Sequence, residues 1–291
     1  MRRRSILVME NTRVDIQALS SALYLGDDGI WYSAENQAIS YPADGNERCF
    51  AVEDTSFWFN HRNRCIQSIV HAFPPPNNGA IFDIGGGNGF VARGLAAAGF
   101  EVVLLEPGQA GATIAKNRGI DNVICATTET AHIKPHALAA VGLFDVIEHI
   151  EHDQAFLQSI HGLMQPGAML YATVPAFPVL WSDEDVLAGH FKRYTVGTIS
   201  DTLTAAGFEM VFASYIFRLL PLPVFLLRTL PFKLGLLKKK RTVAIDPRDH
   251  VVKNGVFSRL LNYILAAELG HLQAKHPMRF GGSCLVVATR R

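Results

Sequence analysis

The periodicity of hydrophobic and polar residues changes near residue 80. Before that point, Phe57 to Val70 place apolar residues at the three- and four-residue spacing of a helix, which the proline-rich stretch 74–79 ends. After it, short apolar runs alternate with helical patterns, beginning with a run at 80–84 and a helix at 90–98. This alternation is typical of parallel strands joined by crossover helices.

The same alternation continues towards the end of the chain. The expected strands are 80–84, 101–105, 122–126, 137–144, 169–174, 208–217 and 283–289, with a further helix at 154–164. They predict an α/β fold with a doubly wound, mostly parallel, seven-stranded sheet. Residues 218–280 are too many for a plain loop, so we expect a helical insertion before the last strand, with an amphipathic helix over 260–272.

Residues 1–56 have no regular pattern. Turn-forming clusters at 26–29 and 42–45 flank residues 30–41 and predict a short β-hairpin there. We therefore treat 1–56 as an N-terminal cap segment and 57–291 as the main domain.

Charge and cysteine content exclude several classes of protein. A formal net charge of +1 provides no field that would attract nucleic acid. The four cysteines lie far apart, without the spacing of a disulfide framework or a zinc ribbon. The basic start of the chain precedes too short an apolar run for a signal peptide, and no stretch of about 18 apolar residues follows. We therefore expect a cytoplasmic protein.

The segment Asp83-Ile84-Gly85-Gly86-Gly87-Asn88-Gly89 carries the first chemical signal. It ends an expected strand and opens an expected helix, so its glycines allow a tight turn and the close approach of a ligand. Glu106 ends the next strand, where its carboxylate can accept hydrogen bonds from both hydroxyls of a ribose. The pattern predicts a nucleotide-like ligand at this edge of the sheet.

A dinucleotide-binding dehydrogenase is one alternative. Its fingerprint requires G-x-G-x-x-G, but counting from Gly85 and Gly87 the third position is Phe90. Asp83 would also repel a pyrophosphate, whereas it would attract the sulfonium and α-amino groups of S-adenosylmethionine. The residues favour S-adenosylmethionine over NAD; a turn with no ligand is the other alternative.

Four stretches of the chain resemble motifs of the class I S-adenosylmethionine-dependent methyltransferases. They are residues 80–89, 106–108, 144–149 and the turn 165–168. Residues 174–195 are similar to a bacterial branch of that family, to which the quinone-biosynthesis O-methyltransferases are related through a shared Glu-His pair. The resemblance covers about 57–217 and the last strand, and leaves 1–56 and 218–280 outside it.

The resemblance implies S-adenosylmethionine as the cofactor. Asp83, Gly85 and Gly87 would contact its methionine portion, Glu106 would hold the ribose, and Asp145 would lie near the methyl group. The acidic residue that usually follows the third strand is replaced by Ala126-Thr127-Thr128, and we assign the adenine contact to Thr127. The fourth strand also lacks its usual Phe-Asp start. The expected cofactor-binding residues are Arg62, Asp83, Gly85, Gly87, Asn88, Glu106, Pro107, Thr127 and Asp145.

The segment 57–63 is dense in aromatic and polar groups. By analogy with related folds, a helix here covers the cofactor and Arg62 pairs with its carboxylate. The alternative is a helix whose rings pack into the core while Arg62 and Arg64 face solvent.

Six ionisable residues fall within the nine positions from Asp145 to Asp153, where ligands bind in such folds. His149 is a candidate general base for a hydroxyl or amine acceptor, and His190 is a second. A divalent metal on Glu148 and His149 is an alternative whose ligand set is incomplete without a distant residue such as His190. A polar loop leading into a helix is another. We assign catalytic roles to Asp145, His149 and His190, and no metal ligand.

Residues 218–241 contain seven basic residues and no acidic one, among leucines and three prolines. This composition suits peripheral contact with an anionic membrane through 218–242. An acceptor-covering segment or a homodimer contact are the alternatives.

We expect methyl transfer to an oxygen, in preference to nitrogen or carbon, of a small-molecule or lipid-linked acceptor. The alternatives are a non-catalytic S-adenosylmethionine-binding protein and an NAD-dependent dehydrogenase.

Overall fold

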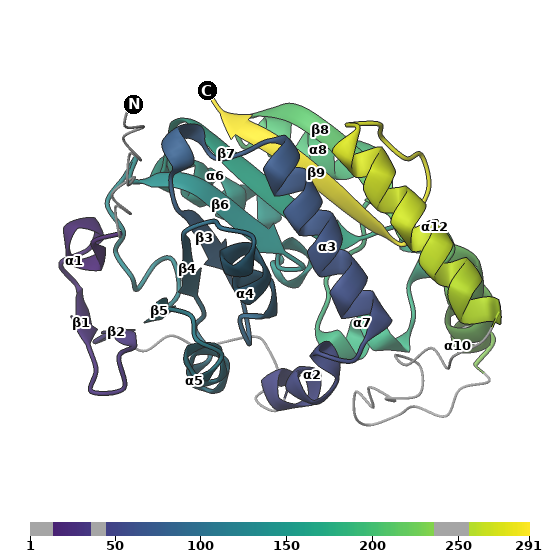
Figure 1. The fold of residues 1–291 in the computed structure, drawn as a ribbon, viewed down its shortest axis with the longest axis horizontal. Coiled ribbons are helices and arrows are strands. Elements are labelled where there is room, and N and C mark those ends of the chain that lie inside the picture. The colour runs from purple at the N-terminus through teal and green to yellow at the C-terminus, as the bar shows by residue number, and fades with distance from the viewer. Residues whose placement is uncertain (1–13, 36–44, 236–255) are drawn as a thin grey trace, which may run out of the picture.

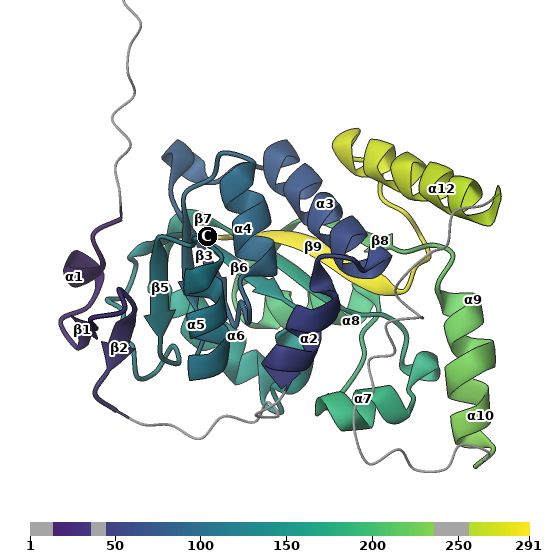
Figure 2. The same cartoon turned by 60° about the horizontal axis from the view of Figure 1, so that its bottom comes forward.

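The computed structural model describes residues 14–35, 45–235 and 256–291. They form one sheet with helices on both faces (Figure 1, Figure 2). The strands are β1 (Leu23–Leu25), β2 (Trp31–Ser33), β3 (Ile81–Ile84), β4 (Val102–Leu105), β5 (Asn122–Cys125), β6 (Leu138–Phe144), β7 (Met164–Pro175), β8 (Phe208–Ile216) and β9 (Ser283–Arg290). Their order is β1-β2-β5-β4-β3-β6-β7-β9-β8.

The α-helices are α1 (Ile16–Leu19), α2 (Gly45–Glu53), α3 (Phe57–Ala72), α4 (Phe90–Ala97), α5 (Gln109–Asn117), α6 (Asp153–Leu163), α7 (Asp183–Ala188), α8 (Val196–Ala205), α9 (Pro221–Val224), α10 (Leu230–Lys233) and α12 (Val256–Gln273). Short helical turns of other types are η1 (Pro76–Asn78), η2 (Ile147–His149), η3 (Pro178–Leu180) and η4 (Phe225–Thr229).

The doubly wound sheet is confirmed, and each of the seven expected strands is present. Strands β3 to β7 run parallel, while β9 pairs in antiparallel fashion with both β7 and β8. β7 begins earlier than expected, because Met164 pairs with Leu138 before the register shifts.

The sheet has nine strands instead of seven, because β1 and β2 extend its edge. They form an antiparallel hairpin, and β2 continues the sheet in parallel with β5 through the pair Trp31–Ile124. The hairpin lies around the turn 26–29, earlier than the expected 30–41; residues 36–44 lie outside the described residues. Trp31 and Tyr32 favour a strand, and β5 offers them an edge with free backbone groups.

This hairpin changes the expected role of the N-terminal segment. Residues 23–33 extend the sheet and do not cap it, whereas α2 packs near α5, over the glycine segment. The boundary expected between residues 56 and 57 stays a prediction.

Two hydrophobic clusters hold the helices on the two faces of the sheet. On one face, α3, α4 and α5 pack around buried residues such as Ile66 and Leu95. On the other, α6 and α8 contribute Leu157 and Leu203. Helix α12 lies beside α3 on the first face (Figure 1).

The expected helical insertion between the last two strands is confirmed. It contains α9, η4, α10 and α12, which includes the predicted helix 260–272. Among the described residues, no helix combines the length and the apolar character needed to cross a membrane.

A buried carboxylate anchors this insertion to the body of the protein. Glu268 of α12 lies 3.0 Å from Nε2 of His61 in α3 and accepts the backbone N–H groups of Phe217 and Arg218 at 2.9 and 2.6 Å. These contacts join α12 to α3 and to the end of β8.

Candidate functional site

The carboxyl ends of β3, β4 and β6 meet at one edge of the sheet, and the loops that follow them form the site. Gly85, Gly87 and Gly89 have φ angles of +69°, +52° and +71°, a backbone region that glycine enters without strain. At Gly85 a Cβ would also lie 2.9 Å from a methyl group of Val146. The loop conformation therefore requires glycine at these positions.

Glu106 joins the two loops that flank this edge. Its carboxylate accepts hydrogen bonds from the N–H of Gly87 at 2.9 Å and from the N–H of Gly108 at 2.8 Å. Burial raises the pKa of Glu106, while these two hydrogen bonds act in the opposite direction. The carboxylate thus lies between the glycine loop and Pro107.

Three charged side chains lie beneath the glycine loop. Asp83 is buried, which raises its pKa to about 7, although the nearby Arg62 guanidinium opposes that shift. Arg62 is also buried and forms an ion pair with Asp145. Asp145 has a φ of +59° and accepts a hydrogen bond from Thr173 Oγ1 at 2.8 Å.

The position of Arg62 decides between the two expectations for α3. Arg62 lies 4.8 Å from the ring centroid of Trp58 and 5.6 Å from that of Phe59, within the site, whereas Arg64 is exposed. The alternative in which Arg62 faces solvent is therefore wrong. Its contact with a ligand carboxylate stays a prediction.

Helix α2 covers the glycine loop through buried polar contacts. Nδ2 of Asn88 donates to the carbonyl of Asn46 at 2.7 Å and to Glu53 at 3.2 Å, and Glu53 pairs with Arg118 at 2.7 Å. The Asn88 amide nitrogen is therefore engaged with α2. Asn46, Glu53 and Arg118 were not predicted, because no local pattern links residues so far apart in the chain.

A cavity of about 700 Å³ adjoins Pro107 and Thr127. One wall comes from the N-terminal hairpin, because β2 runs parallel to β5 and brings Ser33 and Glu35 to the same sheet edge as Thr127. The full lining is Tyr24, Gly26, Asp27, Asp28, Tyr32, Ser33, Glu35, Pro107, Gln109, Cys125, Ala126, Thr127 and Thr130.

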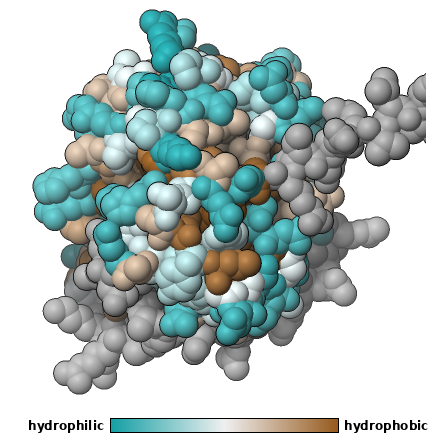
Figure 3. Space-filling model, turned by 90° about the vertical axis from the view of Figure 1, so that its left-hand side faces the viewer, coloured by the Kyte–Doolittle hydropathy of each residue, from teal (hydrophilic) through white to brown (hydrophobic). Residues whose placement is uncertain are grey.

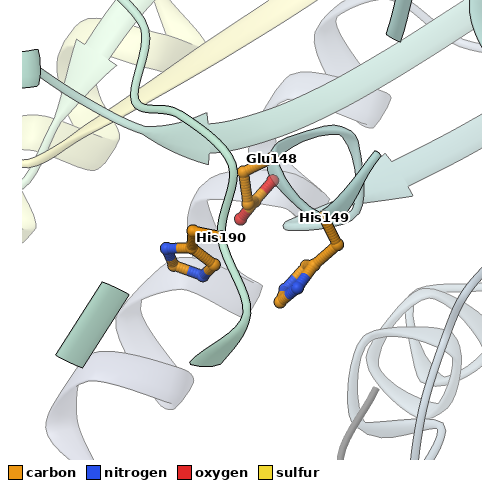
Figure 4. Close-up of side chains that lie close together, drawn as sticks. All are labelled: Glu148, His149 and His190. Atoms are coloured by element: carbon orange, nitrogen blue, oxygen red, sulfur yellow. The ribbon is translucent and has the colours of Figure 1, made fainter. Parts of the chain in front are cut away.

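Glu148, His149 and His190 lie together above the end of β6 (Figure 4). The two imidazole rings are 4.7 Å apart, and one ligand atom from each of the three residues lies within 4.8 Å of the others. Burial raises the pKa of Glu148 to about 8. Burial, and then the charge of His190, lower the pKa of His149 to about 4. The three atoms are close enough to share one ion, which is the expected metal alternative.

Asp185 orients His190. Its Oδ1 lies 2.9 Å from His190 Nδ1 and accepts from Arg193 Nε at 2.7 Å. Burial works against ionisation of Asp185, but the bonds from His190 and Arg193 outweigh it and lower its pKa. An ionised carboxylate only accepts, so Nδ1 of His190 donates its proton to Asp185, and Nε2 is the ring nitrogen that is not bonded to Asp185.

Asp185 was not assigned a role from the sequence, although a signal for its position exists. Ser182 and Asp185 form a capping box at the start of α7, with the Ser182 N–H donating to Asp185 at 2.9 Å. The Phe191 N–H donates to the carbonyl of Glu148 at 2.7 Å, which holds the two histidine-bearing segments together.

Comparisons with known proteins show the family to which the chain belongs. The sequence profile of a family described as a methyltransferase domain matches residues 58–212, just over half of the chain. The mouse mitochondrial ubiquinone biosynthesis O-methyltransferase is 26% identical over 112 residues, which are 35% of this chain and 30% of that protein. Its counterpart from Pectobacterium carotovorum is 26% identical over 97 residues, 31% of this chain and 41% of that protein. The chain thus spans less than half the length of these curated relatives.

Solved structures share the fold at low sequence identity. An S-adenosylmethionine-dependent methyltransferase of Thermotoga maritima has a TM-score of 0.53 at 15% identity, over 86% of this chain and all of that one. A phosphoethanolamine N-methyltransferase of Haemonchus contortus, in complex with S-adenosylmethionine, has a TM-score of 0.53 at 16% identity, over 86% of this chain and 58% of that one. At these identities the likeness shows the fold alone.

Proposed function

The chain belongs to the methyltransferase-domain family, and from this premise we propose that it transfers a methyl group from S-adenosylmethionine to an acceptor. One observation carries the proposal: the sheet edge gathers Asp83, Glu106 and the Arg62–Asp145 pair around one glycine loop. When bound, S-adenosylmethionine supplies an electrophilic methyl group on a sulfonium.

The residues present fit the charges of that molecule. Arg62 binds the methionine carboxylate, and Asp83 and Asp145 face its ammonium and sulfonium groups. Gly85 and Gly87 let the backbone approach the ligand closely. Asp83 is buried and its Oδ2 has no hydrogen-bond partner among the described residues, as expected of a carboxylate that awaits a cationic ligand.

The nucleoside portion of S-adenosylmethionine fits the surroundings of Glu106. Its carboxylate holds the ribose hydroxyls, and the cavity beside Pro107 and Thr127 takes the adenine. Asn88 acts indirectly, by holding α2 over the loop.

We assign the general base to the histidine pair. Nε2 of His190 takes the proton of an acceptor hydroxyl while Asp185 holds the ring in the required tautomer. His149 is neutral at pH 7 because its pKa is low, so it positions the acceptor or accepts a hydrogen bond from it. Proximity and alignment contribute the larger part of the rate enhancement.

We place the acceptor atom at oxygen, in a small-molecule or lipid-linked compound. The likeness to ubiquinone O-methyltransferases supports oxygen over nitrogen, and the two histidines would take the proton that a hydroxyl loses during transfer. Peripheral membrane contact through 218–242 is a separate prediction, and residues 236–242 lie outside the described residues.

Release of S-adenosylhomocysteine from S-adenosylmethionine in the presence of candidate acceptors tests the activity. Calorimetric binding without any release would favour a non-catalytic binder. Binding of NADH without binding of S-adenosylmethionine would favour the dehydrogenase and overturn the proposal. His149→Ala and His190→Ala, made separately, test the base: at least one should lower turnover by about 10²-fold.

A further inference from the structure

The outer face of the insertion is apolar where a surface helix is normally polar. From Leu219 through α9 and η4 to α10, exposed leucines recur at three- and four-residue spacing, where a surface helix usually has polar residues. Leu222 is 65% exposed and Leu227 is 73% exposed. We call this surface the leucine face; it comprises Leu219, Leu222, Leu226, Leu227, Leu230 and Leu234, together with Val179. Contiguous apolar exposure of this kind marks an interaction surface.

The leucine face is fixed to the segment that carries the proposed base. Thr229 Oγ1 donates to the carbonyl of Leu180 at 2.9 Å, and Lys233 Nζ donates to the carbonyl of Val179 at 3.3 Å. Figure 2 shows α9 and α10 lying beside α7. Helix α7 closely follows η3, the turn that contains Val179 and Leu180. Asp185 belongs to α7, and His190 follows it.

Basic residues outnumber acidic ones beside the leucine face. Arg218, Arg228 and Lys233 lie along the same stretch, and residues 218–241 contain no acidic residue; Arg228 forms an ion pair with Glu184 of α7, so Arg218 and Lys233 carry the net positive charge there. The whole chain has a formal net charge of only +1, so this concentration of cations is local. The hairpin side of the molecule differs, because it presents mostly hydrophilic residues with small separate apolar groups (Figure 3).

An apolar stripe flanked by cations complements an anionic lipid surface. Leucines enter the boundary between headgroups and acyl chains, while lysine and arginine remain at the level of the phosphates. A second copy of the chain complements this surface less well, because symmetric pairing would bring the cations of both copies together.

We propose that the leucine face docks on an anionic bilayer and that the methyl acceptor is a lipid-linked molecule taken from that bilayer. The docking stands on the surface alone, whereas the choice of acceptor rests on the proposed function. A bilayer bound here lies next to the segment of Asp185 and His190, so a lipid-linked hydroxyl would reach the base without leaving the membrane.

Flotation of the whole chain with vesicles tests the docking. Vesicles of phosphatidylcholine with about 30% phosphatidylglycerol should carry the protein upward, and pure phosphatidylcholine should bind it at least about tenfold less. The variant L226Q/L227Q should lose at least about tenfold in vesicle binding. The control L25Q/V211Q, which changes two exposed apolar residues elsewhere, should bind as the unmodified chain does.

Two further measurements keep this test decisive. If the melting curve of L226Q/L227Q shows that this variant is misfolded, the variant Leu227→Cys labelled with an environment-sensitive dye replaces it. The emission of the dye should shift to the blue when anionic vesicles are added. The same dye on Leu25→Cys should not respond. Equal flotation of L226Q/L227Q and the unmodified chain would overturn the docking. A dimer that L226Q/L227Q converts to a monomer, with no vesicle binding, would assign the leucine face to self-association and overturn it as well.

The acceptor is tested separately. Tritiated methyl from S-adenosylmethionine should enter chloroform-extractable products when vesicles of a total bacterial lipid extract are supplied, and L226Q/L227Q should lose this labelling while keeping its affinity for S-adenosylhomocysteine. Labelling of water-soluble products alone would overturn the lipid-linked acceptor. Flotation without any binding of S-adenosylhomocysteine would overturn the proposed function and leave the docking intact.

Discussion

Asp83 is buried, yet its proposed role facing a cationic ligand requires the ionised carboxylate. In the free protein its pKa is about 7, because burial penalises the carboxylate more than Arg62 favours it. A cationic ligand reverses that balance, since the ionised form then has a partner. We therefore expect Asp83 to make the binding of S-adenosylmethionine depend on pH.

The pH dependence of binding follows from this pKa. Below pH 7 Asp83 is protonated in the free protein, and binding of S-adenosylmethionine must expel that proton. Affinity should therefore rise about tenfold from pH 6 to pH 8 and then level off. Calorimetry in two buffers of different ionisation enthalpy measures both the affinity and the proton release.

Asp83→Asn should remove this pH dependence and weaken binding at pH 8. Asp201→Asn, an exposed acidic residue on α8, serves as the matched control and should retain it. A slope that survives in Asp83→Asn would assign the titration to another group.

In the proposed mechanism Asp185 acts on the reaction through His190. Asp185→Asn should lower kcat by about tenfold or more with little change in KM for S-adenosylmethionine, because the amide no longer selects the tautomer with a free Nε2. Asp183→Asn, in the same helix, is the control.

At the scale of elements, the hairpin β1–β2 extends the sheet and also lines the cavity that we propose for the adenine. Tyr32 lines the cavity beside Pro107, and its hydroxyl donates to Asp28 at 2.7 Å. Tyr32→Ala should weaken binding of S-adenosylhomocysteine by about tenfold, the magnitude of one lost base–aromatic contact. Leu25→Ala, on β1 and outside the cavity lining, should not. Isothermal titration of both variants makes the comparison.

Local signals explain which elements could be predicted from the sequence. The strand, glycine loop and helix from Ile81 to Ala97 follow from apolar runs and glycines that are neighbours in the chain. The hairpin was misplaced because the clusters 26–29 and 42–45 have the same turn chemistry, and only pairing with β5 selects the first.

Contacts between distant residues could not be predicted in the same way. The role of Asp185 is visible only in the fold, where His190 and Arg193 bond to its carboxylate. Glu53 likewise pairs with Arg118, which is 65 residues away in the chain. Among the site residues, those on the glycine loop and at strand ends were predicted from local motifs and from the resemblance to class I methyltransferases, whereas those that cover or orient the site required the fold.

At the scale of the whole molecule, Glu268 joins helix α12 of the insertion to α3 and to the end of β8. Glu268→Ala would leave His61 and the N–H groups of Phe217 and Arg218 without their acceptor in the interior. The free energy of unfolding should fall by about 3 kcal/mol. Glu268→Gln, which keeps one carbonyl acceptor, should cost less. Urea unfolding followed by circular dichroism gives both values; an equal loss in the two variants would mean that shape, and not hydrogen bonding, holds α12.

The position of the insertion has a consequence for how such a protein can diversify. Ile216 at the end of β8 is paired with Ser283 at the start of β9, so the chain returns to the sheet beside the point it left. Closing a loop between two paired residues costs little more when the loop is longer. A segment from another protein could thus be grafted between these two strands, provided that it supplies an acceptor for Phe217 and His61. Strands β3 to β7 and the loops that follow them would then stay unchanged. Exchange of the insertion alone would alter the acceptor or the cellular surface that the protein binds.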